Sequence, residues 1–361
     1  MKTTSENAPV IQYFIAIAKN VVTGSRFFAR IMLMETIKKI SAGDVRLASR
    51  LIRDLEDKLP HARARLKKLF PHTGKSFIIG ITGSPGAGKS TLTDALIAEM
   101  RKLSKTVGVL AVDPTSPFSG GAILGDRVRM LRHAEDEGVF IRSLATRGAL
   151  GGLSQAVGDA IHVMEAMGRD VIIVETVGIG QQEIDIINHA HSVIVVMVPG
   201  MGDEIQTMKA GILEIADVFA INKADRAGAK QLHTELASLL NGTKLSPDAW
   251  RPPIVMIGNL YETATFIEQM AELAQKVFDH YAYLQDSGQL GKRMERKAMM
   301  EINDALRCCI LEPVIAKLTT SGELQRIAEK VINREFDPYS AAEEISKRFL
   351  KSGGENDTGK K

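Results

Sequence analysis

The chain has 361 residues, a length that suits one large α/β domain with helical additions, or two domains. Apolar residues make up 45% and charged residues 25%, which is ordinary for a globular protein with a sizeable core. The net charge of +3 is small for this length, so neither nucleic acid nor an anionic membrane is expected as the main partner.

Residues 1–72 are predicted to form a helical region. The mostly apolar run Ile11–Ala18 is short and contains polar residues, so we interpret it as an amphipathic or docking segment rather than a secretory signal. One helix is expected over Phe27–Ile40 and a second over Val45–Leu59, with Asp44 as the N-cap of the second. No stretch approaches the roughly 18 uninterrupted apolar residues of a membrane span.

From Ser76 onward, short apolar runs alternate with helical periods. Because these runs lack regular polar alternation, they are predicted to be strands buried on both faces, with the helices between them as crossovers. The expected fold class is α/β, a doubly wound and mostly parallel sheet over residues 73–262 with helical extensions at both ends. The predicted strands are Phe77–Ile81, Val107–Val112, Val139–Leu144, Val171–Val174, Val193–Val198, Val218–Ile221 and Ile254–Ile257.

The first predicted strand leads directly into a glycine-rich loop that fits the pattern G-x-x-x-x-G-K-[ST]. In this pattern the backbone amides and the positive end of the following helix bind phosphates. Lys89 is expected to act as a catalytic residue on the β- and γ-phosphates, and the Ser90 hydroxyl to hold Mg²⁺. A turn without a ligand is the alternative, which the flanking strand and helix disfavour. The residues expected to bind the nucleotide here are Gly83, Ser84, Pro85, Gly86, Ala87, Gly88, Lys89, Ser90 and Thr91.

Three acidic residues are further candidates for the Mg²⁺ site. Asp113 closes the second predicted strand and Asp126 opens a helix, and each has a plain alternative as a turn residue or an N-cap. Glu175 follows a buried strand, where Asp is more usual, and is also expected to take part in catalysis. The amide of Gly178 is predicted to contact the γ-phosphate, so loss of that phosphate would move the segment after it.

The glycine-containing loop Pro199–Lys209 enters a predicted helix. Two interpretations of this loop stay open. It is either a switch that responds to the nucleotide or a helix start capped by Asp203.

The segment Asn222–Asp225 directly follows the strand Val218–Ile221 and has the pattern N-K-x-D. The Asp225 carboxylate can accept hydrogen bonds from the N1–H and the exocyclic amine of guanine, whereas adenine offers no such paired donors. Asn222 and Lys223 are assigned to the same site. A polar turn is the alternative, but the phosphate-binding loop in the same chain favours guanine. GTP or GDP with Mg²⁺ is therefore the expected ligand.

After Asn259 the strand pattern stops. Residues 263–351 are predicted to be a helical region that contacts a second subunit or a partner, and residues 352–361 a disordered tail. Cys308 and Cys309 are adjacent, belong to no C-x-x-C pattern, and are expected to be buried small side chains. Their scarcity fits a reducing cytosol, so a cytoplasmic location is predicted.

Taken together, these motifs closely resemble those of the MeaB/ArgK-like GTPases, relatives of the methylmalonic aciduria type A protein. The resemblance implies a GTP-hydrolysing chaperone that gates delivery of adenosylcobalamin to a cobalamin-dependent acyl-CoA mutase, such as methylmalonyl-CoA mutase, and protects that enzyme. It also implies a homodimer in which the terminal helices help the subunits meet. The residues that carry it are Gly83–Thr91, Val112–Met130, Glu175–Gln181, Pro199–Lys209 and Asn222–Asp225, and the match continues through Trp250–Pro253.

The chain departs from this family at the last guanine-binding element, where relatives usually have Ser after the strand. Here the residues are Gly258, Asn259 and Leu260. Their backbone amides are still expected to contact the guanine carbonyl.

A second feature concerns the attacking water. In Ras-like GTPases a glutamine after the switch glycine orients this water, whereas Ile179 follows Gly178 here. Gln181, two residues further on, is the candidate for the role. Intrinsic hydrolysis is therefore expected to be slow without a partner.

Two other functions stay open at this point. A kinase or ATPase linked to arginine and ornithine transport is the enzyme alternative, and the guanine element Asn222–Asp225 argues against it. The other alternative is a scaffold that binds GTP but hydrolyses it too slowly for turnover to matter. Metal storage is disfavoured because the eight His are scattered and no cysteines have metal-ligand spacing.

Overall fold

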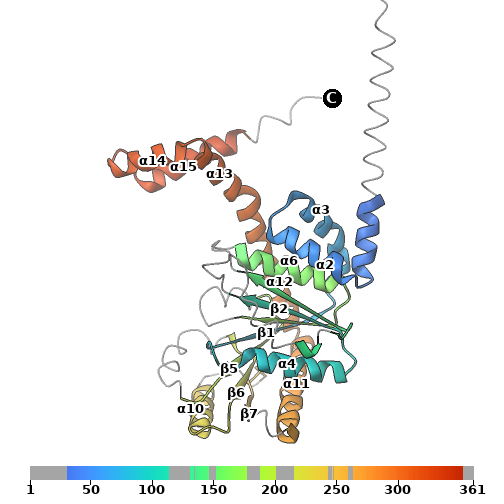
Figure 1. Ribbon diagram of the computed structural model, residues 1–361. Coiled ribbons are helices and arrows are strands. Elements are labelled where there is room, and N and C mark those ends of the chain that lie inside the picture. Colours follow the sequence, from blue (N-terminus) through green and yellow to red (C-terminus); the bar gives the residue numbers. More distant parts are fainter. Residues whose placement is uncertain are drawn as a thin grey trace, which may run out of the picture. The chain divides into compact units, whose positions relative to one another are not determined.

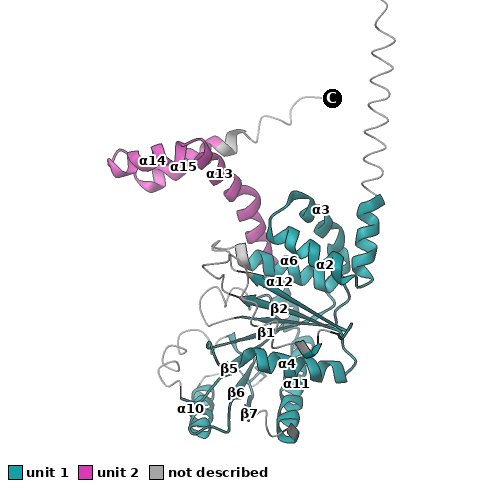
Figure 2. Ribbon diagram, in the orientation of Figure 1, with its two compact units in different colours: residues 1–297 teal, residues 298–361 magenta. Residues whose placement is uncertain are grey.

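The computed structural model describes residues 31–113, 131–133, 135–145, 152–176, 188–200, 215–242, 246, 248–258 and 263–352. The chain divides into two compact units, residues 1–297 and 298–361, shown in teal and magenta in Figure 2. The first unit contains the sheet and the second is helical. The predicted boundaries at 72/73 and 262/263 stay predictions.

The first unit is built on seven parallel strands in the order β3-β2-β4-β1-β5-β6-β7. All seven predicted strands and the parallel, doubly wound sheet are confirmed. Runs rich in Val and Ile are typical of parallel strands, because such strands are buried on both faces. Strand β1 is central, so its carboxyl end lies at the middle of the sheet edge. The strands are β1 Phe77–Gly83, β2 Val107–Asp113, β3 Val139–Ala145, β4 Val171–Glu175, β5 Ser192–Met197, β6 Val218–Asn222 and β7 Ile254–Ile257.

Helices cover both faces of this sheet (Figure 1). Helices α2 (Val45–Glu56), α3 (Pro60–Leu69) and α6 (Gly152–Ala166) pack together on one face. Helices α4 (Lys89–Lys102) and α11 (Thr263–Asp286) pack against each other on the opposite face. The phosphate-binding loop is held between the sheet and the second of these layers, since α4 follows β1 directly.

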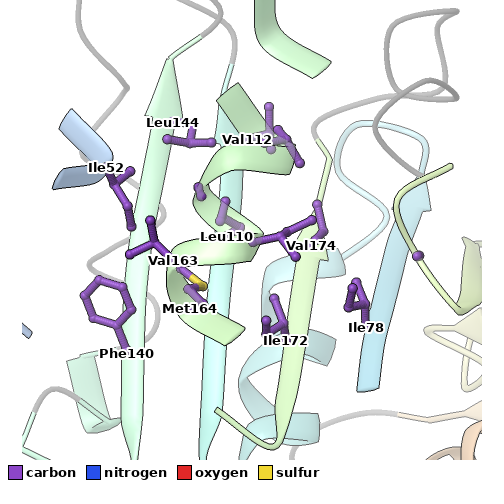
Figure 3. Packing of buried hydrophobic residues seen from close by; sticks show 14 of the residues in the cluster. Ile52, Ile78, Leu110, Val112, Phe140, Leu144, Val163, Met164, Ile172 and Val174 are labelled. Carbon is purple, nitrogen blue, oxygen red and sulfur yellow. The ribbon is translucent and has the colours of Figure 1, made fainter. Parts of the chain in front are cut away.

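Each strand supplies side chains to both hydrophobic layers. In β4, Ile172 and Val174 belong to the cluster with α2 and α6, and the alternate residues Val171 and Ile173 belong to the cluster with α4 and α11. Figure 3 shows the first cluster, where Met164 of α6 lies against the strands. The two hydrophobic clusters, one on each face of the sheet, fix the position of the strand ends that form the site.

The cap predicted for one of the N-terminal helices is confirmed. Asp44 is the N-cap of α2, and its Oδ1 accepts a hydrogen bond of 2.9 Å from the amide of Leu47, as predicted. The second predicted helix ends earlier than expected, at Glu56, because Pro60 holds Leu59 in an extended conformation and begins a new helix. The short 3-10 helix η1 (Phe70–His72) follows α3.

The remaining helices of the first unit connect the strands to the C-terminal region. Helix α10 (Ala229–Gly242) lies between β6 and β7, and the 3-10 turn η2 (Leu131–His133) precedes β3. Helix α12 (Gln289–Leu306) begins in the first unit and contains the boundary at residue 297.

The second unit consists of helices with one π-helical turn. The π-helical turn η3 (Arg307–Leu311) separates α12 from α13 (Glu312–Thr320), and α14 (Glu323–Ile332) and α15 (Pro338–Ser352) complete the unit. Among the described residues, no helix is long and apolar enough to cross a membrane.

The expectation that both cysteines are buried is wrong for one of them. Cys308 is buried, and Cys309 is exposed. Neighbouring residues of a helix point in different directions around its axis, so two adjacent side chains do not both face one narrow buried stripe.

Candidate nucleotide site

The predicted site residues that the structure describes meet at the carboxyl edge of the parallel sheet. Register pairs Ile81 of β1 with Glu175 of β4, and β6 ends at Asn222. In open parallel sheets, ligands bind outside the carboxyl ends of the strands. The phosphate loop, the acid of β4 and the guanine element therefore share one edge.

Two glycines of the loop lie where a Cβ would meet a residue of a neighbouring strand. Gly88 has φ +89°, and a Cβ built there would lie 2.4 Å from Nδ2 of Asn222. A Cβ on Gly83 would lie 2.2 Å from the carbonyl oxygen of Val196 on β5. Any side chain at either position would push the loop away from the neighbouring strand end, because these distances are far below van der Waals contact.

Lys89 is the first residue of α4 and is buried. Its Nζ donates hydrogen bonds to the carbonyl oxygens of Gly83 at 2.6 Å and Ser84 at 2.9 Å. These bonds hold the ammonium over the loop that precedes it. The first turn of α4 contains no acidic residue, so no carboxylate on it competes with an anion for the loop amides.

Glu175 accepts hydrogen bonds from two hydroxyls of α4. Ser90 Oγ donates to Oε1 at 2.6 Å, and Thr93 Oγ1 donates to Oε2 at 2.8 Å. All three side chains are buried. Because Ser90 gives its proton to Glu175, the lone pairs of its oxygen are available to a cation.

This arrangement fits Mg²⁺. The ion usually binds through one or two protein oxygens together with substrate phosphates and water, and does not need a protein cage. Within the described residues, no three His, Cys, Asp or Glu side chains lie together as a metal site. Ser90 is therefore the described residue best placed as a direct ligand, and Glu175 supports it through the hydrogen bond.

The guanine element is attached to the phosphate loop. Asn222 Nδ2 donates to the carbonyl oxygen of Ala87 at 2.8 Å, and Lys223 Nζ donates to that of Gly86 at 2.9 Å. Lys223 takes a left-handed backbone conformation with φ +56°. Strand β6 and the loop after β1 thus form one rigid wall.

A cavity of about 260 Å³ lies next to this wall. It combines apolar side chains with a few polar groups, as small-molecule sites do. Asp225 lies at the cavity with an exposed side chain. The lining residues are Gly88, Thr91, Leu92, Asn222, Lys223, Asp225, Arg226, Ile257, Gly258 and Phe266.

Residues beyond the sequence motifs shape the same cavity. The amide of Gly258 donates to Oε1 of Gln269 on α11 at 2.8 Å, and the amide of Ala224 donates to the carbonyl of Ile257 at 2.8 Å. Sequence reasoning missed Gln269, Phe266 and Thr93. Of these three, only Thr93 could have been found from the sequence, because it follows Ser90 by three residues and therefore lies on the same face of the predicted helix.

Some predicted residues have no described side chain. Asp113 is the last residue of β2, and its backbone pairs with Ala145 of β3, but its side chain lies outside the described part. The whole of the predicted loop Pro199–Lys209 after Gly200 also lies outside it. The other predicted site residues outside the described part are Asp126, Gly178, Gln181, Asn259 and Leu260.

Comparison with known proteins matches the chain to one family. The family described as "Methylmalonyl Co-A mutase-associated GTPase MeaB" matches residues 48–319. A protein of Pyrococcus abyssi named as a GTPase is 48% identical over 325 residues, which cover 89% of this chain and 98% of the relative. The mitochondrial methylmalonic aciduria type A homolog of Caenorhabditis elegans is 30% identical over 342 residues, covering 92% of this chain and 82% of the relative.

A solved structure has the same fold. The crystal structure of an LAO/AO transport system kinase superposes with a TM-score of 0.64 at 25% sequence identity, and covers 89% of this chain and 98% of the other. The sheet and the nucleotide site described above lie within residues 48–319, the range that the family match covers.

Proposed function

Because this chain belongs to the MeaB family of GTPases, we propose that it is a cytoplasmic, Mg²⁺-dependent chaperone of a cobalamin-dependent acyl-CoA mutase. In this proposal its nucleotide state gates delivery of adenosylcobalamin to the mutase, with methylmalonyl-CoA mutase as the first candidate, and protects that enzyme. GTP hydrolysis itself is the activity of the family.

One observation carries the proposal. The family description names methylmalonyl-CoA mutase, and the match extends over residues 48–319, beyond the nucleotide domain into α13. A match confined to the phosphate loop would support only nucleotide binding, since that loop is shared by many unrelated enzymes. The C. elegans relative, named for methylmalonic aciduria, supports the same client.

In this proposal, different groups of described residues bind the phosphates, the guanine and Mg²⁺. The amides of Gly83–Thr91 and the start of α4 would hold the phosphates, and Lys89 would neutralise charge on the β- and γ-phosphates. Asn222, Lys223 and Asp225 would hold the guanine in the adjoining cavity. Mg²⁺, held by Ser90 with support from Glu175, would neutralise phosphate charge during phosphoryl transfer.

Residues that lie outside the described part, or whose side chains do, complete the proposal. Asp126, and Asp113 as a second acid, are proposed to assist the metal, Gly178 to sense the γ-phosphate, and Gln181 to orient water. Asn259 and Leu260 are proposed to contact the guanine carbonyl through their amides, whereas Gly258, whose amide donates to Gln269, lines the cavity. Binding of the mutase would then speed a slow intrinsic hydrolysis by holding these groups at the γ-phosphate.

We also propose a homodimer built on the C-terminal helices. Several large apolar side chains of the second unit are exposed. Scattered single residues of this kind are normal on a protein surface, but these recur at helical spacing. They lie three or four residues apart, on one side of the helix that runs from α12 into η3. The residues are Met299, Ile302, Leu306 and Ile310.

A transport-linked kinase is the second candidate, because the solved structure of similar fold is named LAO/AO transport system kinase. A relative at 30% identity is named GTPase ArgK, from Escherichia coli. The guanine element favours a GTPase over an adenine-dependent kinase. A kinase would also transfer the γ-phosphoryl group to an acceptor other than water, whereas a GTPase transfers it to water.

The test measures GTP hydrolysis with and without purified methylmalonyl-CoA mutase, together with transfer of adenosylcobalamin to the apo-mutase. We expect hydrolysis to accelerate with the mutase and transfer to depend on GTP. Lys89→Ala should abolish both while the protein stays folded, because the phosphate charge loses its main cation. Lys102→Ala, at the far end of α4, is the matched control. Rates that ignore every acyl-CoA mutase of the host would defeat the chaperone proposal.

A further inference from the structure

The carboxylate of Glu175 is held from two sides by one helix. Its Oε1 accepts a hydrogen bond of 2.6 Å from Ser90, and its Oε2 accepts one of 2.8 Å from Thr93. Glu175 is 5% exposed and Thr93 is 0% exposed, so both bonds are shielded from water. A buried charge-assisted hydrogen bond is stronger than one at the surface.

Helix geometry explains why both hydroxyls reach the same carboxylate. Ser90 and Thr93 are three residues apart, so they lie on one face of α4 in successive turns. The strand register places Glu175 beside Ile81, two residues before the phosphate loop. Thr93 itself lies outside the pattern Gly83–Ser90.

A glutamate needs this second support more than an aspartate would. Glu has one more rotatable bond than Asp before its terminal torsion, and that torsion is broad and roughly two-fold in both residues. The Ser90 bond to Oε1 alone leaves rotation about that torsion possible. The Thr93 bond to Oε2 fixes the carboxylate plane.

We propose that Thr93 is a positioning residue of the magnesium site. By holding Oε2 of Glu175, it directs Oε1 to the Ser90 proton, and this in turn keeps the Ser90 oxygen lone pairs facing Mg²⁺. The inference rests on the proposed magnesium role of Ser90. Partners of this kind orient metal ligands in many proteins, and their loss typically costs about 10- to 100-fold in metal affinity.

A purely structural role is the competing explanation. A buried threonine on a helix needs an acceptor and often finds one in the carbonyl four residues earlier. Thr234 on α10 does so, with a 2.9 Å bond to the carbonyl of Lys230. Thr93 instead donates to a carboxylate on another element.

The test is magnesium affinity in the full chain, measured through binding of fluorescent methylanthraniloyl-GDP at increasing MgCl₂ and in EDTA. Thr93→Val keeps the shape of the side chain and removes the hydroxyl, and Thr93→Ser keeps the hydroxyl. We expect Thr93→Val to raise the half-saturating Mg²⁺ concentration about tenfold. Nucleotide binding in EDTA should change by less than about twofold, and Thr93→Ser should restore the magnesium response.

A second comparison separates positioning from packing. In a Glu175→Gln background, Thr93→Val should change the magnesium response little further, because the two side chains act as one unit. Thr234→Val is the control for loss of a helical threonine hydroxyl.

The possible outcomes are distinct. If the wild type depends on Mg²⁺ and Thr93→Val has the same half-saturating Mg²⁺ concentration, the inference is overturned. The inference is also overturned if Thr93→Val lowers nucleotide affinity equally with and without Mg²⁺, because an equal loss indicates that Thr93 contributes to packing alone. A wild type indifferent to Mg²⁺ would overturn both the inference and the proposed magnesium site.

Discussion

The Arg293 guanidinium donates two hydrogen bonds to the carboxylate of Asp217, at 2.6 and 2.8 Å. Asp217 is buried and directly precedes β6, the strand that ends at Asn222 of the guanine element. It also accepts hydrogen bonds from the amide of Val193 and lies 3.2 Å from Nε2 of His280. One carboxylate therefore ties α11 and α12 to the amino ends of β5 and β6.

Removing Arg293 should strongly destabilise the first unit. Arg293→Met leaves the buried Asp217 charge without its main partner, and we expect a loss of about 3–5 kcal/mol in the free energy of unfolding. Urea denaturation measures it. The exposed pair Lys39–Glu35, at 2.9 Å, provides the control, because Lys39→Met should cost no more than about 1 kcal/mol. Equal costs for the two variants would show that the Asp217 cluster contributes little.

Stability should fall in mild acid because two buried histidines resist protonation. Burial lowers the pKa of His191 and of His280 to about 4, below the ordinary value of 6.5. Nδ1 of His191 accepts from the amide of Ile78 at 3.2 Å, a bond that a proton on this nitrogen would break.

The sign of this effect follows from proton binding. Between pH 6.5 and 4 the unfolded chain binds more protons at these two sites than the folded chain, so folding stability decreases as the pH falls through this window. Each histidine contributes up to about 3 kcal/mol by pH 4. Urea denaturation at pH 7, 5.5 and 4.5 measures it, with His191→Gln and His280→Gln expected to flatten the profile. A wild-type profile that stays flat from pH 7 to 4.5 would contradict the prediction.

Guanine selectivity should depend on Asp225. Asp225→Asn replaces an acceptor for two guanine donors with an amide that also donates, so GTP affinity should fall at least about tenfold. Affinity for xanthosine triphosphate should rise, since xanthine has a carbonyl in place of the amine. Competition binding with GTP, ATP and xanthosine triphosphate measures the change. Unchanged preference for GTP in the variant would remove Asp225 from the site.

Gln269 should hold the cavity wall after β7. Gln269→Leu removes the acceptor of the Gly258 amide, so the wall loses a 2.8 Å hydrogen bond beside the guanine cavity. We expect GDP affinity to fall about three- to tenfold, while affinity for inorganic triphosphate, which lacks a base, stays the same. Gln275→Leu is the control, because the exposed Gln275 side chain donates a hydrogen bond to Asp279 on the same helix, α11. A matching loss for the phosphate ligand would point to damage at the phosphate loop.

Much of the fold could be predicted from sequence because its signals are local. The seven strands are continuous apolar runs, and such runs identify buried parallel strands without knowledge of their neighbours. The phosphate loop and the N-K-x-D segment are likewise contiguous, and parallel topology places both at the carboxyl edge of the sheet. The N-cap at Asp44 was also a local signal, and the structure has the predicted bond.

The partners of the site residues were decided by tertiary packing. Thr93 and Glu175 are 82 residues apart, and Arg293 and Asp217 are 76 apart. No spacing rule links such pairs, since their meeting depends on how α4, α11 and α12 lie against the sheet. The sequence by itself determined the strands and the ligand class, whereas the packing of helices on the sheet determined which side chains position the ligand-binding groups.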